Sequence, residues 1–346
     1  MSEPLRPAFR AEGAAVQAFW DGLRRSTQAR IGLGRAGDAL PTAEVLEFRA
    51  AHAAARDAVH KPLDVTALAA EVAGLGLGEP VHVRSLAADR SEYLRRPDLG
   101  RLPGGVEPAD PARNPAANSV AGRTIWSGPG SAAHAGADAG SGPGQEAGEV
   151  LSALPYSGAD VGFVLADGLS PYALANHGIP MLAALMESLG DRYTLAPPVI
   201  ATQARVALGD HIAAALGVTT VLVLIGERPG LSVADSLGIY LTHHPRPGRA
   251  DSERNCISNI HPPEGLSYLR AAQVATGLVD GAHRLGRSGV ELKDTSTNQP
   301  LAPSASATPS LGRHPEAEPL ILDATPTTPA PADIPPRLLL DTSDPS

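Results

Sequence analysis

Three apolar, strand-like runs separated by helical stretches constrain the fold of this chain more than any other feature. The runs span 161–166, 198–203 and 218–225. The residues between them, at 171–189 and 206–216, have helical periodicity. Apolar strands that alternate with helices are typical of βαβ units, whose strands run parallel beneath covering helices. Residues 150–294 are therefore expected to form a doubly wound parallel sheet.

The rest of the 346 residues divides into three further segments. Residues 1–102 are interpreted as a helical N-terminal region, because apolar side chains recur there at steps of three and four. Residues 103–149 are a low-complexity insertion rich in Gly, Ala and Pro, and residues 295–346 are a tail with eleven prolines. Neither can bury enough surface to offset its ordering entropy, so both are expected to be disordered. The expected fold class is α/β, with a Rossmann-like domain at 150–294.

Composition and charge exclude several classes of function. No stretch approaches the roughly 18 apolar residues of a membrane span, and the N-terminus lacks an apolar secretion signal. The expectation is therefore a cytoplasmic protein without a membrane partner. The net charge of −9 is concentrated in the two low-complexity segments, where acidic residues outnumber basic ones. The remainder is nearly neutral, so no nucleic-acid partner is expected. A single cysteine excludes an internal disulfide framework.

Polar or glycine-rich residues follow each of the three strand-like runs. These breaks are DGLS at 167–170, QARV at 203–206 and GERPG at 226–230. Ligands of parallel α/β sheets bind beyond the carboxyl ends of the strands, so the three breaks predict a ligand site. Arg205 and Arg228 lie in these breaks, where they are suited equally to ligand oxygens and to surface salt bridges.

The segment Gly32–Gly37 matches the dinucleotide fingerprint G-x-G-x-x-G. That fingerprint requires a strand before it and a helix that begins within it, so that helix N–H groups meet the pyrophosphate. Here polar residues precede the segment, and the next helix opens only at Pro41. A glycine loop that joins two helices is the favoured interpretation.

Several long motifs in a fixed order carry the most specific signal in the sequence. The second half contains ADGLS, RVALGD, IGERPGLSVADSLGIYLT and PRPGRADSERNCISNI, and the first contains ARIGLGRAG, FRAAHAAARDAVH and DRSEYLRRPDLGRL. Together they resemble the small subunit of ethanolamine ammonia-lyase. The resemblance covers roughly 20–102 and 150–294, and the insertion and the tail depart from the family pattern.

The resemblance implies a subunit of an adenosylcobalamin-dependent lyase that converts ethanolamine to acetaldehyde and ammonia. The large subunit is the implied partner and holds the substrate site, so no catalytic residue is expected in this chain. The implied location is cytoplasmic, and in some members of the family it is inside a bacterial microcompartment. Positions that match the family's cofactor contacts are Val206, Glu227 and Cys256.

Residue chemistry agrees with two of these three positions. The corrin ring is rimmed by amide side chains that donate hydrogen bonds, so the carboxylate of Glu227 is a suitable acceptor. Val206 offers apolar contact to the macrocycle. A lone cysteine is more often a small buried hydrophobe, so only the family resemblance points to Cys256.

Histidine patterns in the chain do not meet the spacing of metal sites. Asp280 and His283 nearly match D-x-H-x-x-G, the loop that supplies a histidine to cobalt in base-off cobalamin proteins, but they are one residue too far apart. Their helical surroundings also favour a solvent-facing His283. His243 and His244 lack further ligands at useful spacing and are interpreted as strand-end polar residues. Base-on cobalamin and no metal ligand in this chain are therefore expected.

Two alternatives remain open from the sequence. One is a stand-alone, nucleotide-dependent oxidoreductase of Rossmann type that uses the glycine segment at 32–37. The other is a non-enzymatic microcompartment assembly protein that docks through its tail or its first helix.

Overall fold

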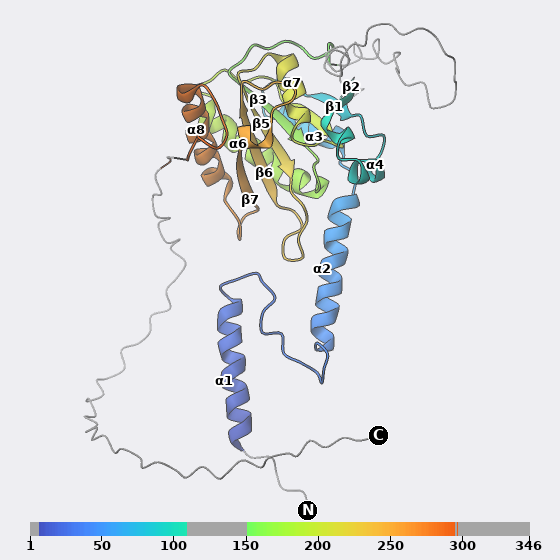
Figure 1. Ribbon diagram of the computed structural model, residues 1–346, viewed down its shortest axis with the longest axis vertical. Coiled ribbons are helices and arrows are strands. Elements are labelled where there is room, and N and C mark those ends of the chain that lie inside the picture. Colours follow the sequence, from blue (N-terminus) through green and yellow to red (C-terminus); the bar gives the residue numbers. More distant parts are fainter. Residues whose placement is uncertain (1–6, 109–150, 295, 297–346) are drawn as a thin grey trace, which may run out of the picture. The chain divides into compact units, whose positions relative to one another are not determined.

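The computed structural model describes residues 7–108, 151–294 and 296 (Figure 1). Predictions for the tail and for most of the insertion lie outside these residues. The elements are α1 (Pro7–Arg24), α2 (Thr42–His60), α3 (Val65–Gly74), β1 (Val81–Ser85), α4 (Arg90–Arg95), η1 (Leu99–Arg101), β2 (Pro103–Pro108), β3 (Val161–Ala166), α6 (Pro171–Leu189), β4 (Val199–Thr202), α7 (Leu208–Leu216), β5 (Thr220–Gly226), β6 (Leu237–His243), η3 (Asp251–Glu253), β7 (Asn255–Ile260) and α8 (Tyr268–Leu285).

The strands form one mixed sheet of seven, in the order β2-β1-β4-β3-β5-β6-β7 (Figure 1). The four central strands β1, β4, β3 and β5 run parallel, while β2 at one edge and β6 and β7 at the other are antiparallel. The expected parallel sheet is therefore a mixed sheet, with antiparallel pairing at both edges. The chain passes from β5 to β6 and on to β7 without a crossover helix, and direct connections of this kind produce antiparallel neighbours.

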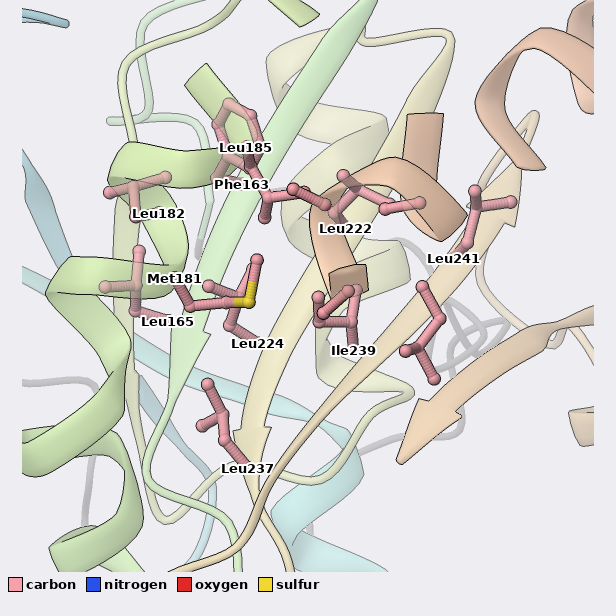
Figure 2. Packing of buried hydrophobic residues seen from close by; sticks show 14 of the residues in the cluster. Phe163, Leu165, Met181, Leu182, Leu185, Leu222, Leu224, Leu237, Ile239 and Leu241 are labelled. Atoms are coloured by element: carbon pink, nitrogen blue, oxygen red, sulfur yellow. The ribbon is translucent and has the colours of Figure 1, made fainter. Parts of the chain in front are cut away.

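Helices cover both faces of the sheet. Successive side chains of a strand point to opposite faces, so each central strand contributes to two hydrophobic cores. Helices α3, α6 and α8 pack with Phe163 and Leu165 of β3 and Leu222 of β5 on one face (Figure 2). Helix α7 packs with Val164 of β3 and Val223 of β5 on the other face. The fold is thus an α/β fold in which helices cover the central strands of the sheet on both faces.

The central elements agree closely with the sequence-based expectations. Strand β3 and helix α6 have the expected bounds. The hydroxyls of Ser170 and Ser267 accept hydrogen bonds from backbone N–H groups three residues on, which satisfies donors in the first turns of α6 and α8. None of the helices in the described part of the chain is both long and apolar enough to cross a membrane.

Two strands lie outside residues 150–294, the segment that was expected to form the sheet. Residues 81–85, within the expected helical region, form β1, and residues 103–108, within the expected insertion, form β2. Within the described part of the chain, β2 pairs only with β1, and β1 pairs with β4 on its other side. The sequence PGGVEP has a single large apolar side chain, so pairing at the edge of an existing sheet, and not local propensity, makes it a strand.

The glycine segment at 32–37 is a loop between α1 and α2, as expected. Helix α1, and not a strand, comes before it, and α2 begins only at Thr42. Gly32 and Gly34 have positive φ angles of 61° and 75°. A side chain at Gly32 would also collide with the indole of Trp20. Positive φ angles at Gly32 and Gly34, and close packing at Gly32, account for these glycines without a bound nucleotide.

Candidate functional site

A cavity of about 330 Å³ lies at the carboxyl ends of the parallel strands. Its lining residues are Tyr93, Leu169, Arg205, Val206, Ile225, Gly226, Glu227, Arg228 and Tyr240. Leu169 follows β3, Val206 follows β4 and Glu227 follows β5, so all three predicted breaks contribute to it. Predicted residues Val206 and Glu227 therefore lie in one cavity, together with Arg205 and Arg228.

Glycines allow the ends of β3 and β5 to approach closely beneath this cavity. Gly168 has a φ of 57°, and a Cβ there would lie 2.3 Å from the carbonyl oxygen of Gly226. A Cβ at Gly226 would lie 2.0 Å from the carbonyl oxygen of Ser170. Both distances are too short for any side chain, so the turn requires glycine at these two positions.

Asp167 is the buried anchor of the loop that carries Val206. Its carboxylate accepts hydrogen bonds from the backbone N–H groups of Gln203 at 2.9 Å and Ala204 at 3.0 Å. Gln203 has a positive φ of 52°, which these bonds hold in place. A guanidinium nitrogen of Arg90 lies 3.5 Å from the same carboxylate. Burial raises the pKa of Asp167, against the opposing effects of Arg90 and the backbone donors.

The ring of Tyr93 is flanked by two guanidinium groups. The guanidinium carbon of Arg205 lies 4.4 Å from the ring centroid and that of Arg90 lies 4.8 Å from it. The Tyr93 hydroxyl donates a hydrogen bond to the carbonyl oxygen of Ala204 at 3.1 Å, and burial raises its pKa. The ring is therefore a neutral platform that fixes the side chain of Arg205 at the cavity.

Glu227 joins the ends of three strands through its carboxylate. The hydroxyls of Ser236 and Ser258 donate to its two oxygens, and the backbone N–H of Asn259 donates at 3.3 Å. Ser236 precedes β6, and the other two residues lie in β7. An ionised carboxylate offers about four acceptor positions. Three are used within the chain, which leaves one for a ligand in the cavity.

Cys256 lies beside the cavity and is not among its lining residues. It pairs with Tyr240 across β6 and β7, and Tyr240 lines the cavity. The Cys256 side chain is exposed, yet neighbouring protein atoms displace enough water to raise the pKa of its thiol, and Glu227 raises it further. The thiol is therefore protonated at neutral pH, which suits contact with a neutral ligand group.

Two lining residues, Tyr93 and Tyr240, were not expected from the sequence. Tyr93 comes from α4, which lies more than a hundred residues before Arg205 in the chain. Its only signal is membership in the motif DRSEYLRRPDLGRL. Tyr240 lies within an apolar strand, where a tyrosine looks like an ordinary core residue.

His283 lies far from the cavity and does not face solvent as expected. It is half-buried, with Nε2 3.3 Å from the hydroxyl of Thr220, which also contacts His243 at 2.8 Å. Thr220 begins β5 and Glu227 follows its end, a separation of roughly 20 Å at the rise of a strand. Within the described residues, no group of three or more His, Cys, Asp or Glu side chains is arranged to hold a metal ion.

Comparison with known protein families shows which family the chain belongs to. A family model described as ethanolamine ammonia-lyase light chain (EutC) matches residues 17–108 and 136–293, which is more than half of the chain. The chain belongs to this family. The matched ranges of the light-chain family include every residue that lines the cavity.

Individual relatives support the light-chain assignment over most of the sequence. The ethanolamine ammonia-lyase small subunit of Rhodococcus erythropolis is 57% identical over 289 residues, covering 84% of this chain and 95% of the relative. The small subunit of Azotobacter vinelandii is 44% identical over 281 residues, covering 81% and 90%. Light-chain membership confirms the resemblance and leaves no support for a stand-alone oxidoreductase, because the glycine segment also lacks its required strand and helix.

Proposed function

We propose that this chain is the small subunit of an adenosylcobalamin-dependent ethanolamine ammonia-lyase, and that its strand-end cavity holds part of the cobalamin. The observation that carries the proposal is the convergence of Val206 and Glu227 in one cavity of a light-chain family member. Residues 150–294 would then act as a Rossmann-like cobalamin-binding domain. The proposed location is the cytoplasm, with or without an enclosing microcompartment.

The chemistry of the lining fits a corrin edge. Amide groups on the corrin rim can donate to the remaining acceptor position of Glu227. Val206, Leu169 and Ile225 offer apolar contact to the macrocycle. Cobalamin is much larger than the cavity, so a partner subunit would have to enclose the rest of it.

Under this proposal the chain binds and orients, and it does not carry out the chemical step itself. When bound, the cofactor would supply an adenosyl radical, through homolysis of its cobalt–carbon bond, to take a hydrogen atom from ethanolamine. The substrate site is proposed for the large subunit. Base-on binding is proposed because His283, which comes nearest to the base-off histidine pattern, lies at the other end of β5 from the cavity.

Reconstitution tests the proposed function. The purified chain, a purified large subunit and their mixture are each given adenosylcobalamin and ethanolamine, and acetaldehyde is measured. Only the mixture is expected to release acetaldehyde. Release by this chain alone, or a mixture no more active than the large subunit alone, would contradict the assignment.

A further inference from the structure

We propose that Arg205, supported by the ring of Tyr93, binds the phosphate of the cobalamin nucleotide loop. This inference rests on the proposed function and names a subsite within the cavity. It concerns the tail of the cofactor that carries its lower base, and not the amide-rimmed corrin.

The position of Arg205 is fixed before any ligand arrives. One face of its guanidinium packs on the Tyr93 ring, and its backbone N–H donates to the carbonyl oxygen of Gly100 at 2.8 Å. Tyr93 is itself held by its hydrogen bond to Ala204 and by Arg90 on the ring. Little side-chain entropy would therefore be lost on binding, which favours a specific contact over a loose one.

The hydrogen-bonding capacity of Arg205 is incompletely used. Its Nε is buried and has no hydrogen-bond partner among the described residues. An unpaired buried donor costs about 1–3 kcal/mol, and more when it carries charge. Arg205 also lines the cavity, so its other guanidinium N–H groups are available to an acceptor on a ligand there.

The charge around the cavity favours an anion over a neutral amide. Among the described residues, no carboxylate lies within salt-bridge distance of Arg205 or Arg228, whereas Arg90 has Asp167. The carboxylate of Glu227 is met by hydroxyl and backbone donors. Arg205 also faces the like charge of Arg90 across the Tyr93 ring. An amide oxygen would supply only a hydrogen bond, while a phosphate oxygen also supplies the missing negative charge, and Arg matches phosphate geometry well.

Binding of two cobalt corrinoids distinguishes whether Arg205 contacts the phosphate or the corrin amides. Cobalamin carries the nucleotide loop, while cobinamide keeps the corrin and most of its amides but lacks the loop. Affinities of both for the assembled two-subunit complex are measured by absorbance titration, with wild type, Arg205→Gln and Arg205→Lys. Arg205→Gln is expected to weaken cobalamin binding by about 10- to 100-fold and to leave cobinamide binding within about twofold. Arg205→Lys should recover part of the loss, because it keeps the charge.

Controls separate the possible failures. Arg96→Gln removes an exposed arginine whose partner is Asp98, and it should change neither affinity. Melting curves of each complex show whether Arg205→Gln remains folded. If it does not, the cobalamin and cobinamide affinities of Arg205→Lys are compared with those of wild type instead. Equal losses for cobalamin and cobinamide, or no loss at all, would overturn the phosphate assignment while leaving the cavity as a cobalamin site. A wild-type complex that binds neither corrinoid would instead overturn the proposed function.

Discussion

Glu227 combines a structural and a binding role in one carboxylate. Its oxygens accept from Ser236 and Ser258, so the side chain ties the end of β5 to the strands that follow. The same carboxylate lines the cavity, where one acceptor position remains. Substitutions therefore have to separate the loss of a ligand contact from the loss of the connection between strands.

Replacing Glu227 should weaken cobalamin binding. Glu227→Ala in the assembled complex is expected to reduce affinity by roughly 10- to 150-fold, because a hydrogen bond to a charged group contributes about 1.5–3 kcal/mol. Glu227→Gln keeps an acceptor oxygen and should lose less. Cofactor titration measures both, and Glu264→Ala, at an exposed glutamate, is the matched control. Unchanged affinity in the alanine variant would remove Glu227 from the site.

His243 makes the free energy of unfolding depend on pH. Burial, together with the smaller effects of neighbouring His244, His283 and Arg249, lowers its pKa to about 4. An unfolded histidine has a pKa of about 6.5, so the unfolded state binds more protons between these values. Stability contributed by neutral His243 is therefore complete above about pH 6.5 and falls as the pH drops towards 4.

The expected result for His243→Gln is a flatter pH profile. Urea unfolding at several pH values from 4 to 7 should show a smaller decrease in stability on acidification than in wild type. The control is His52→Gln, which replaces an exposed histidine on the surface of α2. If the slope between pH 4 and 6.5 is the same in His243→Gln and wild type, another group controls the acid response.

At the scale of elements, a buried ion pair fastens α7 to the turn before β7. The guanidinium of Arg254 donates to both carboxylate oxygens of Asp210, at 2.7 and 2.6 Å, and to the hydroxyl of Thr242 at 2.8 Å. Both charged side chains are almost fully buried. Arg254 stands two residues before Cys256, so this pair also sets where β7 begins beside the cavity.

Breaking the pair from one side should destabilise the fold strongly. Arg254→Met leaves a buried carboxylate unpaired, for which a loss of about 3–5 kcal/mol is expected. The double variant Asp210→Leu/Arg254→Met removes both charges and should recover at least half of that loss. Urea denaturation measures each, with Arg287→Met at an exposed pair as the control. A double variant no more stable than Arg254→Met would show that the hydrogen bonds, and not the stranded charge, dominate.

The elements that sequence could predict are those buried on both faces. Strands β3 and β5 are continuous apolar runs because helices cover each side, and their flanking glycines and polar residues mark the site. Strands β1 and β2 depend on pairing with neighbours, which leaves little trace in five or six residues. Tyr93 reaches the cavity only through tertiary packing of α4, so no local pattern could have placed it there.

At the scale of the whole molecule, the boundary of the insertion determines which residues can be deleted without loss of stability. Residues 109–147 and 298–346 have the composition of low-complexity sequence, whereas 103–108 form the edge strand β2. Replacing 109–147 by a short Gly/Ser linker and deleting 298–346 should leave the melting temperature within a few degrees of wild type. Extending the first deletion back to 103 should lower it clearly, since β1 loses its neighbour. Equal melting temperatures for the two deletion variants would show that β2 contributes little.

The cavity is assembled from residues that are widely separated along the chain, between Tyr93 in α4 and Tyr240 in β6. A chain still being synthesised therefore has no complete pocket until residue 240 has emerged and β6 has paired with β5. A ligand of this pocket therefore binds only chains in which the sheet is complete. At a ligand concentration of a hundred times its Kd, it adds about 2.7 kcal/mol to their free energy of unfolding. The ligand would thereby protect complete chains selectively, because chains with an incomplete sheet bind no ligand and remain sensitive to proteolysis.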